Sequence, residues 1–375
     1  MTVFDQEKKV LVLDGGFGTT LEDVFHKDIS TPLWSAKPID EDPGLIINTH
    51  LAFLRAGADI ILTSTYQCAF STFEKAGYSR EDAVRLMRKS VQLAVAAKAL
   101  YLADRKDVLP HQVKIALSLG PFGATLSPAQ EFGGYYPPPY GPGGSKDKGT
   151  NALNDDVEEE RAIEALKEFH LERLRVFKED EEAWNAIDFI AFETVPLTRE
   201  IRAIRRAVAT LQSEDPMWSK PYWISAVFPE GRFPEKDDTG QHVEIAKVVK
   251  ALLEHDKDQI AAYPDGIGIN CTSVEFLFPL VQGISKEIIQ PTREQVERRP
   301  WLVLYPNGGD VYEPTTKSWI PQRNEKSWSD SFGGVVHEVV DAEIWPGIIV
   351  GGCCKTRPHD IYELSKIVKH SICKP

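Results

Sequence analysis

Residues 9–13 read KVLVL and are followed at once by the turn Asp14-Gly15-Gly16. A short apolar, β-branched run that stops at a glycine-rich or polar turn is typical of a buried strand. The same arrangement occurs eight times along the chain, and a longer segment separates each occurrence from the next. The predicted strands are Lys9–Leu13, Asp59–Leu62, Val113–Leu119, Ile187–Phe192, Tyr222–Phe228, Gly266–Ile269, Trp301–Leu304 and Gly347–Val350.

Helical patterns lie between these strands. The clearest covers Arg80–Leu102, where apolar side chains recur at the spacing of one helix face. Because a helix between two strands returns the chain to the same edge, the strands are expected to pair in parallel. Eight such units favour an α/β fold of the (β/α)8 TIM-barrel type, with residues 1–375 as one domain. The other predicted helices are Glu158–Glu179, Arg199–Leu211, His242–Leu253 and Asp360–His370.

Three turn-rich segments make the chain longer than a minimal barrel: Pro121–Asn151, Pro229–Gly240 and Gly308–Lys326. Each follows the carboxyl end of a predicted strand, so all three are expected as insertions on the C-terminal face, where barrels carry out chemistry. They are either tolerated surface loops or lids over a site.

Composition excludes several classes of partner. Hydrophobic residues make up 42% of the chain and charged residues 26%, as in ordinary soluble globular proteins. The net charge of −13 and the lack of a Lys/Arg-rich run argue against nucleic acid as a partner. No apolar stretch approaches the roughly 20 residues that span a bilayer, which argues against membrane insertion. The first residues show no signal-peptide pattern, so a cytoplasmic protein is expected.

The cysteines provide the strongest chemical signal. Five cysteines without a visible export signal argue against a disulfide framework. Cys271 follows the sixth predicted strand, and the adjacent Cys353 and Cys354 follow the eighth, so only the seventh strand separates them in a barrel. Three thiolates are typical of a zinc site whose fourth position is open to water or substrate. The sequence predicts Zn2+ at these three residues; buried, unreactive cysteine is the alternative, and it is the preferred interpretation for Cys68 and Cys373.

Two acids stand at the ends of predicted strands. Asp14 begins a glycine-rich turn that lacks the third glycine of a dinucleotide-binding motif and the Gly-Lys-Ser/Thr of a phosphate loop. That turn is either a simple strand-to-helix connection or a place where a ligand approaches the backbone beside a carboxylate. Glu193 ends the fourth strand, where barrels place functional groups. Two acids at one barrel mouth suit a substrate that carries an ammonium group.

Seven blocks of the sequence together resemble the homocysteine S-methyltransferase family. They are LDGGFGTTLE (13–22), GADIILTSTYQ (57–67), SLGPFG (118–123), FETVP (192–196), GINCTS (268–273), YPNGG (305–309) and GGCCKTRPHDI (351–361). The pairing of GINC with GGCC is the most specific part, and YPNGG and SLGPFG resemble the branch that uses a sulfonium methyl donor. The resemblance implies an enzyme that transfers a methyl group from S-methylmethionine or S-adenosylmethionine to L-homocysteine and forms methionine.

Position by position, the resemblance implies that the three cysteines bind zinc and that a second set of residues contacts the substrate. The second set is Asp14, Gly15, Thr63, Gln67, Glu193 and Asn307. Asp14, Gly15 and Glu193 would hold the amino-acid end of homocysteine. The betaine-dependent enzyme has a tyrosine at the position of Gln67 that can occupy the open zinc site. Water or the Asn307 side chain is therefore the expected resting ligand.

The resemblance implies a mechanism without a general acid or base. A thiol is a poor nucleophile below its pKa of about 8.5. Zinc would deprotonate homocysteine and hold the thiolate for attack on a sulfonium methyl group. No residue is therefore assigned as a proton donor or acceptor.

Two other classes of barrel protein stay open from the sequence. One is an aldolase or isomerase that binds phosphate at Gly351-Gly352 and uses Lys355 as base or imine former, which leaves the adjacent cysteines unexplained. The other is a non-catalytic zinc or redox-sensing barrel with a fourth protein ligand. Metal analysis separates the first from a zinc enzyme, and a new zinc–sulfur bond with homocysteine separates the second.

Overall fold

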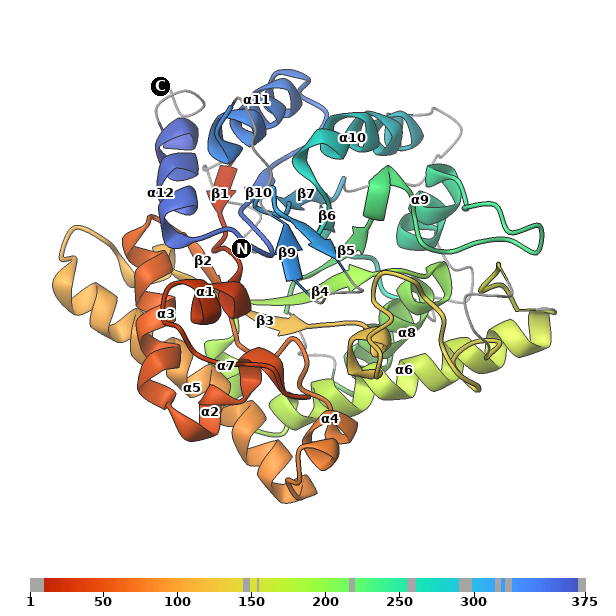
Figure 1. The fold of residues 1–375 in the computed structure, drawn as a ribbon, viewed down its shortest axis with the longest axis horizontal. Helices are drawn as coiled ribbons and strands as arrows, with labels where there is room; N and C mark the ends of the chain where they lie inside the picture. The colour runs from red at the N-terminus through yellow and green to blue at the C-terminus, as the bar shows by residue number, and fades with distance from the viewer. Residues whose placement is uncertain are drawn as a thin grey trace.

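The computed structural model describes residues 10–143, 149–153, 155–215, 220–254, 261–289, 299–313, 318–320 and 326–369. Its centre is a ring of eight parallel strands with helices around it (Figure 1). The predicted strands are all present, and the largest difference is at β4, which runs on to Val195. In order around the ring, the strands are β1 (Val10–Val12), β10 (Ile348–Val350), β7 (Trp301–Tyr305), β6 (Gly266–Asn270), β5 (Tyr222–Val227), β4 (Phe189–Val195), β3 (Lys114–Leu119) and β2 (Ile60–Leu62).

The ring closes between its first and last members, β1 and β2. Leu13 and Ile60 form a parallel bridge just beyond β1. The backbone N–H of Asp59 donates to the Val12 carbonyl at 2.7 Å, and that of Asp14 donates to the Ile60 carbonyl at 3.0 Å. The remaining neighbours pair as parallel ladders. The predicted (β/α)8 TIM-barrel fold is confirmed.

Alternate residues of each strand face opposite sides of the barrel wall. In β1, Val10 and Val12 pack in the core between the strands and the helices, whereas Leu11 packs inside the barrel. The interior is filled by side chains, as is usual for this fold, so chemistry is expected at its mouth. The interior cluster consists of Leu11, Leu13, Ile60, Leu62, Ala116, Phe189, Ala191, Trp223, Trp301, Val303, Tyr305 and Ile349.

The five helices predicted from the sequence are present as α5, α6, α8, α9 and α12, with ends shifted by up to three residues. The Ser79 hydroxyl caps α5 by accepting from the Asp82 N–H at 3.1 Å. None of the described helices is long and apolar enough to cross a membrane. The helices are α1 (Phe17–Asp23), α2 (Pro38–Glu41), α3 (Pro43–Arg55), α4 (Phe70–Lys75), α5 (Arg80–Asp104), α6 (Asp156–Lys178), α7 (Glu181–Ala186), α8 (Thr198–Glu214), α9 (Ile245–Leu253), α10 (Val274–Ile289), α11 (Trp328–Asp341) and α12 (Pro358–Ile367), with short 3-10 turns η2 (Trp34–Ala36), η3 (Pro110–Gln112), η4 (Phe122–Thr125) and η6 (Pro229–Gly231).

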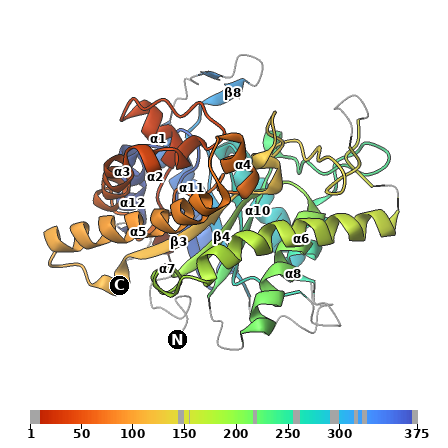
Figure 2. The ribbon, with the colours of Figure 1, turned by 90° about the horizontal axis from the view of Figure 1, so that it is seen from below.

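The turn-rich segments gather at one end of the barrel, where β8 also lies (Figure 2). The third segment contains an antiparallel hairpin, β8 (Val311–Glu313) with β9 (Ser318–Ile320), which the sequence did not predict. Its strands, VYE and SWI, mix polar and apolar residues and so lack the apolar run that marks the barrel strands. Residues 144–148 of the first segment and residues 314–317 and 321–325 of the third lie outside the described residues.

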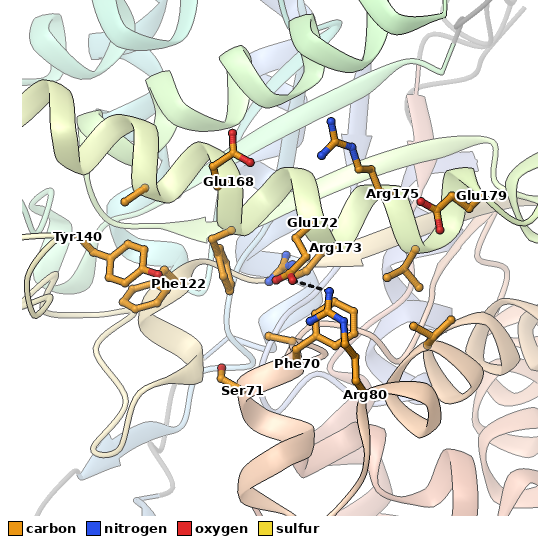
Figure 3. Close-up of a pocket in the computed structure, with 15 residues that line it drawn as sticks. Phe70, Ser71, Arg80, Phe122, Tyr140, Glu168, Glu172, Arg173, Arg175 and Glu179 are labelled. Atoms are coloured by element: carbon orange, nitrogen blue, oxygen red, sulfur yellow. Dashed lines mark hydrogen bonds and ion pairs between the residues drawn. The ribbon is translucent and has the colours of Figure 1, made fainter.

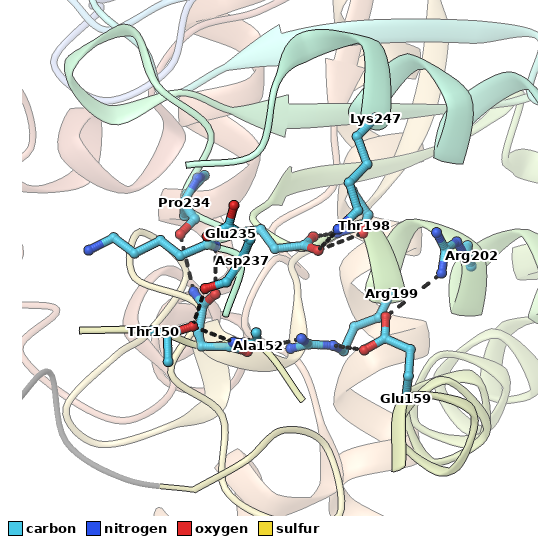
Figure 4. A network of polar contacts seen from close by, with 12 residues as sticks. Thr150, Ala152, Glu159, Thr198, Arg199, Arg202, Pro234, Glu235, Asp237 and Lys247 are labelled. Carbon is cyan, nitrogen blue, oxygen red and sulfur yellow. Dashed lines mark hydrogen bonds and ion pairs between the residues drawn. The ribbon is translucent and has the colours of Figure 1, made fainter. Parts of the chain in front are cut away.

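A buried polar network fastens the first two segments to each other and to the barrel. The Asn151 amide donates to the carbonyls of Gly133 at 2.9 Å and Pro234 at 3.1 Å. Its Oδ1 accepts from the Lys236 N–H at 2.8 Å. Arg199, at the start of α8, donates to the Asn151 carbonyl at 2.9 Å (Figure 4). These bonds hold both segments in one arrangement over the mouth.

Candidate metal centre

The three predicted zinc ligands lie together at the mouth. Cys271 follows β6, and Cys353 and Cys354 follow β10, with β7 between the two strands. The three Sγ atoms all lie within 4.8 Å of one another. Cys271 is buried, and the other two cysteines are half-buried. Their convergence follows from strand order, because neighbouring parallel strands end at the same face.

The structure pairs two of these sulfurs. The sulfurs of Cys271 and Cys353 are in contact, with Cα atoms 5.5 Å apart, and Cys354 is a free thiol. This contact lies inside the sulfur cluster that the sequence assigns to a metal ion. Only thiolates bind a metal, so the metal-binding state is the reduced one.

The donor set itself fits a soft divalent cation. Three sulfurs from neighbouring strand ends leave a fourth position for another ligand. Burial raises the pKa of the Cys354 thiol to about 12. A cation at this position would offset that effect by stabilising the thiolate.

Asn270 lies next to the sulfur cluster, and the sequence did not identify it as a site residue. Its Oδ1 accepts from the Thr194 N–H at 2.7 Å, and its Nδ2 donates to the Thr194 hydroxyl at 2.8 Å. Nδ2 also lies 3.9 Å from the Cys353 sulfur. Thr194 and Cys271 both have positive φ, 59° and 48°, in the left-handed region that costs non-glycine residues energy. Asn270 thus stabilises a strained backbone next to the sulfurs; its position directly before Cys271 was the available signal.

The Cys353-Cys354 turn is held against the turn after β1. The Thr356 hydroxyl donates to the Cys353 carbonyl at 2.6 Å and accepts from the Gly16 N–H at 2.9 Å. A side chain at Gly16 would collide with the Cys353 carbonyl, and one at Gly15 would come within 2.9 Å of the Thr356 carbonyl. The glycines allow two turns of this chain to approach each other. The space beside Gly15 and Gly16 is filled by protein.

Asp14 is fully buried at this junction. Its Oδ2 accepts from the Leu62 N–H at 2.8 Å, but its Oδ1 has no hydrogen-bond partner among the described residues. Burial raises the pKa of Asp14 well above its usual range, and the nearby charge of Glu193 adds to this effect. An unpartnered buried carboxylate oxygen is suited to a cationic hydrogen-bond donor.

Glu193 is the second acid and is 5% exposed. The Ser118 hydroxyl donates to its Oε1. The Ser118 N–H in turn donates to the Thr63 hydroxyl at 3.1 Å, so Thr63 joins the same group. Burial raises the pKa of Glu193 to about 7. Within the described part of the chain, neither Glu193 nor Asp14 has a lysine or arginine partner.

Two more predicted substrate contacts have unpartnered side-chain oxygens. Gln67 Oε1 and Asn307 Oδ1 are buried and accept no hydrogen bond from the described residues. Asn307 is fixed through its backbone, whose N–H donates to the Thr272 carbonyl at 3.0 Å. Lys355, the base of the aldolase alternative, instead forms an ion pair with Asp23 at 2.8 Å.

A cavity of about 650 Å³ lies outside the barrel, between α4, α5 and α6 (Figure 3). Arg80 and Glu172 form an ion pair of 2.7 Å across it, and Arg80 also stacks on the Phe70 ring. The cavity has no cysteine in its lining, so we place the chemistry at the barrel mouth, where sulfurs and unpaired acids converge.

The fold and the sulfur cluster define a (β/α)8 barrel with a cysteine site, at the carboxyl ends of its strands, that is able to hold a metal ion. The family model described as homocysteine S-methyltransferase matches residues 11–368. The chain belongs to this family of enzymes, which sets aside the aldolase and non-catalytic alternatives.

Relatives and a solved structure agree with this assignment. Homocysteine S-methyltransferase 2 of Zea mays is 32% identical, over 96% of this chain and 90% of the relative. Selenocysteine Se-methyltransferase of Brassica oleracea var. italica is 31% identical, over 95% and 88%. The homocysteine methyltransferase MmuM from Escherichia coli, solved in metallated and oxidized forms, is 26% identical over 96% of both chains. Its metallated form superposes with a TM-score of 0.64.

Proposed function

We propose that this protein is a zinc-dependent methyltransferase that moves a methyl group from a sulfonium donor to the thiolate of L-homocysteine and forms methionine. The single observation that carries the proposal is the convergence of three cysteine sulfurs at the barrel mouth. The family assignment and the names of the relatives support homocysteine as the acceptor. The metallated form of MmuM supports a metal at the sulfur cluster.

Cys271, Cys353 and Cys354 are the proposed zinc ligands. When bound, zinc would supply a homocysteine thiolate at neutral pH and hold it in the open position. Asn270 orients this end of the site through its contact with the Cys353 sulfur and its two bonds to Thr194. Outer hydrogen bonds of this kind fix the orientation of metal ligands.

Asp14 and Glu193 are proposed to bind the ammonium group of homocysteine. Both carboxylates are buried and lack a basic partner in the described part of the chain, and burial raises the pKa of each. A bound cation would stabilise their ionised forms. Thr63 belongs to the same hydrogen-bonded group through Ser118. Gly15, Gln67 and Asn307 complete the proposed substrate contacts, the last two through their unpartnered oxygens.

The transfer itself is an in-line displacement. The bond between the methyl carbon and the donor sulfur breaks, its electron pair stays on the donor, and a new bond forms to the homocysteine sulfur. The donor changes from a sulfonium to a neutral thioether, so no proton moves once the thiolate exists. Walls that exclude water favour this loss of charge, because the transition state is less charged than the bound reactants. The methyl donor is proposed to be S-methylmethionine or S-adenosylmethionine, and a cytoplasmic location stays a prediction.

A methyl-transfer assay tests the proposal. The metal-loaded protein is incubated with homocysteine and, in parallel, with S-methylmethionine, S-adenosylmethionine or betaine, and methionine is measured by mass spectrometry. We expect methionine from at least one sulfonium donor and little from betaine. Absence of methionine with every donor, from protein that contains stoichiometric zinc, would contradict the proposed function.

A further inference from the structure

Glu131 is a mouth-side acid that the proposed reaction does not use. It lies in the first turn-rich segment, between η4 and α6. The residue is half-buried, but its Oε2 atom is buried and has no hydrogen-bond partner among the residues that the structure describes. A buried carboxylate oxygen without a partner is costly unless a ligand completes it.

The turn that carries Glu131 is held in place on both sides. The Gln130 N–H donates to the Gly123 carbonyl at 2.9 Å, and the Gly134 N–H donates to the Gln130 carbonyl at 2.8 Å. A side chain at Gly123 would come within 2.8 Å of the Glu131 nitrogen, so this turn packs closely on η4. The Asn151 amide then holds Gly133, two residues beyond Glu131, from the network of Figure 4. The scaffold therefore positions this carboxylate.

Glu131 lies at the barrel mouth, because its turn packs on Gly123, which follows the carboxyl end of β3. Its negative charge raises the pKa of the Cys354 thiol and of the Tyr66 hydroxyl, after the larger effect of burial in each case. Tyr66 follows β2 and accepts a hydrogen bond on its carbonyl from the Gly120 N–H at 2.9 Å, directly before η4. Burial raises the pKa of Glu131 itself to about 7, so a bound cation would favour its ionised form.

We propose that Glu131 determines donor specificity by binding the positive charge of the methyl donor. This inference rests on the proposed function. Asp14 and Glu193, which accept hydrogen bonds from Leu62 and Ser118, are assigned to homocysteine, and this leaves Glu131 for the donor. The sulfur cluster and Glu131 then leave excess negative charge that a sulfonium compound neutralises and an uncharged thioether does not. The positive charge disappears as the methyl group moves, so Glu131 stabilises the bound donor more than the transition state and acts on KM.

The test compares Glu131→Gln with the parent protein at pH 8, where the parent carboxylate is ionised. We expect the KM for the sulfonium donor to rise on the order of 10- to 100-fold, as for the loss of one hydrogen bond to a charged group. Because Glu131 favours the bound donor over the transition state, the kcat is expected not to fall, and the KM for homocysteine is expected to stay unchanged. Glu230→Gln is the matched control, because Glu230 is an exposed acid on the neighbouring mouth-side turn η6. We expect it to change none of these constants.

Calorimetric titration of the zinc-loaded protein with S-methylmethionine, without homocysteine, gives the same comparison without turnover. Weaker donor binding by Glu131→Gln but not by Glu230→Gln supports the inference. If Glu131→Gln fails to fold, Glu131→Asp keeps the charge on a shorter side chain, and an intermediate donor KM supports the inference. An unchanged donor KM in a folded variant overturns the role of Glu131 and leaves homocysteine methylation standing. A parent protein that methylates no homocysteine overturns both.

Discussion

Replacing Glu193 with glutamine should raise the free energy of unfolding and weaken the binding of homocysteine. Glu193 is 5% exposed, and burial raises its pKa from 4.5 to about 7. Each pH unit of such a difference corresponds to about 1.4 kcal/mol, so the ionised carboxylate costs the folded protein about 3 kcal/mol. The new amide needs an acceptor for its N–H groups, which removes about 1 kcal/mol of that gain. At pH 8 and without homocysteine, we expect Glu193→Gln to be about 2 kcal/mol more stable than the parent.

The stability gain of Glu193→Gln over the parent should increase as the pH rises. The folded protein binds a proton at Glu193 more tightly than the unfolded chain does, so the stability that this proton confers is present below pH 4.5. It is lost as the pH rises from 4.5 through about 7. The parent and the variant should therefore differ little at pH 5 and differ fully at pH 8.

Urea unfolding at the two pH values measures this difference. Glu338→Gln, an exposed acid on α11, is the matched control and is expected to show no pH-dependent gain. The same Glu193→Gln variant should bind homocysteine on the order of 10- to 100-fold more weakly, because a charged hydrogen bond to the ammonium group is lost. A variant that is less stable than the parent at pH 8 would refute the view of Glu193 as a buried charge without a basic partner. Unchanged homocysteine affinity would refute its role as an amine anchor.

Two further substitutions test the metal end of the site. Cys353→Ser should lose both zinc and methyl transfer. The control Cys68→Ser, at a buried cysteine far from the cluster in sequence, should keep both. Stoichiometric zinc with full activity in Cys353→Ser would contradict the ligand assignment. Asn270→Ala should keep zinc at saturating concentration but bind it about 10- to 100-fold more weakly, as is usual for an outer hydrogen-bond partner of a metal site. It should also lower the free energy of unfolding by about 2 kcal/mol, because two hydrogen bonds to Thr194 are lost. A chelator competition assay measures the zinc affinity, and urea unfolding measures the stability. Parent-like values in both would exclude Asn270 as a support of the metal site.

The barrel could be predicted because its signal is local and repeated. Every strand is a short apolar run ending at a turn, and eight of them leave few alternatives. The hairpin β8–β9 was missed because its strands lack a continuous apolar run. The glycines after Asp14 were identified, but their close packing against the turn at Cys353 was not predicted.

The candidate site was predictable where side chains follow strands directly. Cys271 and the adjacent pair Cys353 and Cys354 converge because strand order alone brings their strands together. Asn270 was not identified, since its role depends on the left-handed backbone of Thr194, a feature of tertiary structure. Glu131 was not identified either, because it reaches the mouth through a long turn-rich segment whose path no periodic pattern describes.

Homocysteine is expected to complete a zinc site built from three cysteines of this chain. X-ray absorption at the zinc edge, recorded on the reduced protein with and without homocysteine, tests this most directly. Without homocysteine, we expect three sulfur neighbours at about 2.3 Å and one lighter ligand. With homocysteine, we expect a fourth sulfur neighbour at the same distance. A spectrum that does not change on addition of saturating homocysteine would exclude homocysteine as a zinc ligand, and one without three protein sulfurs would exclude the three-cysteine site.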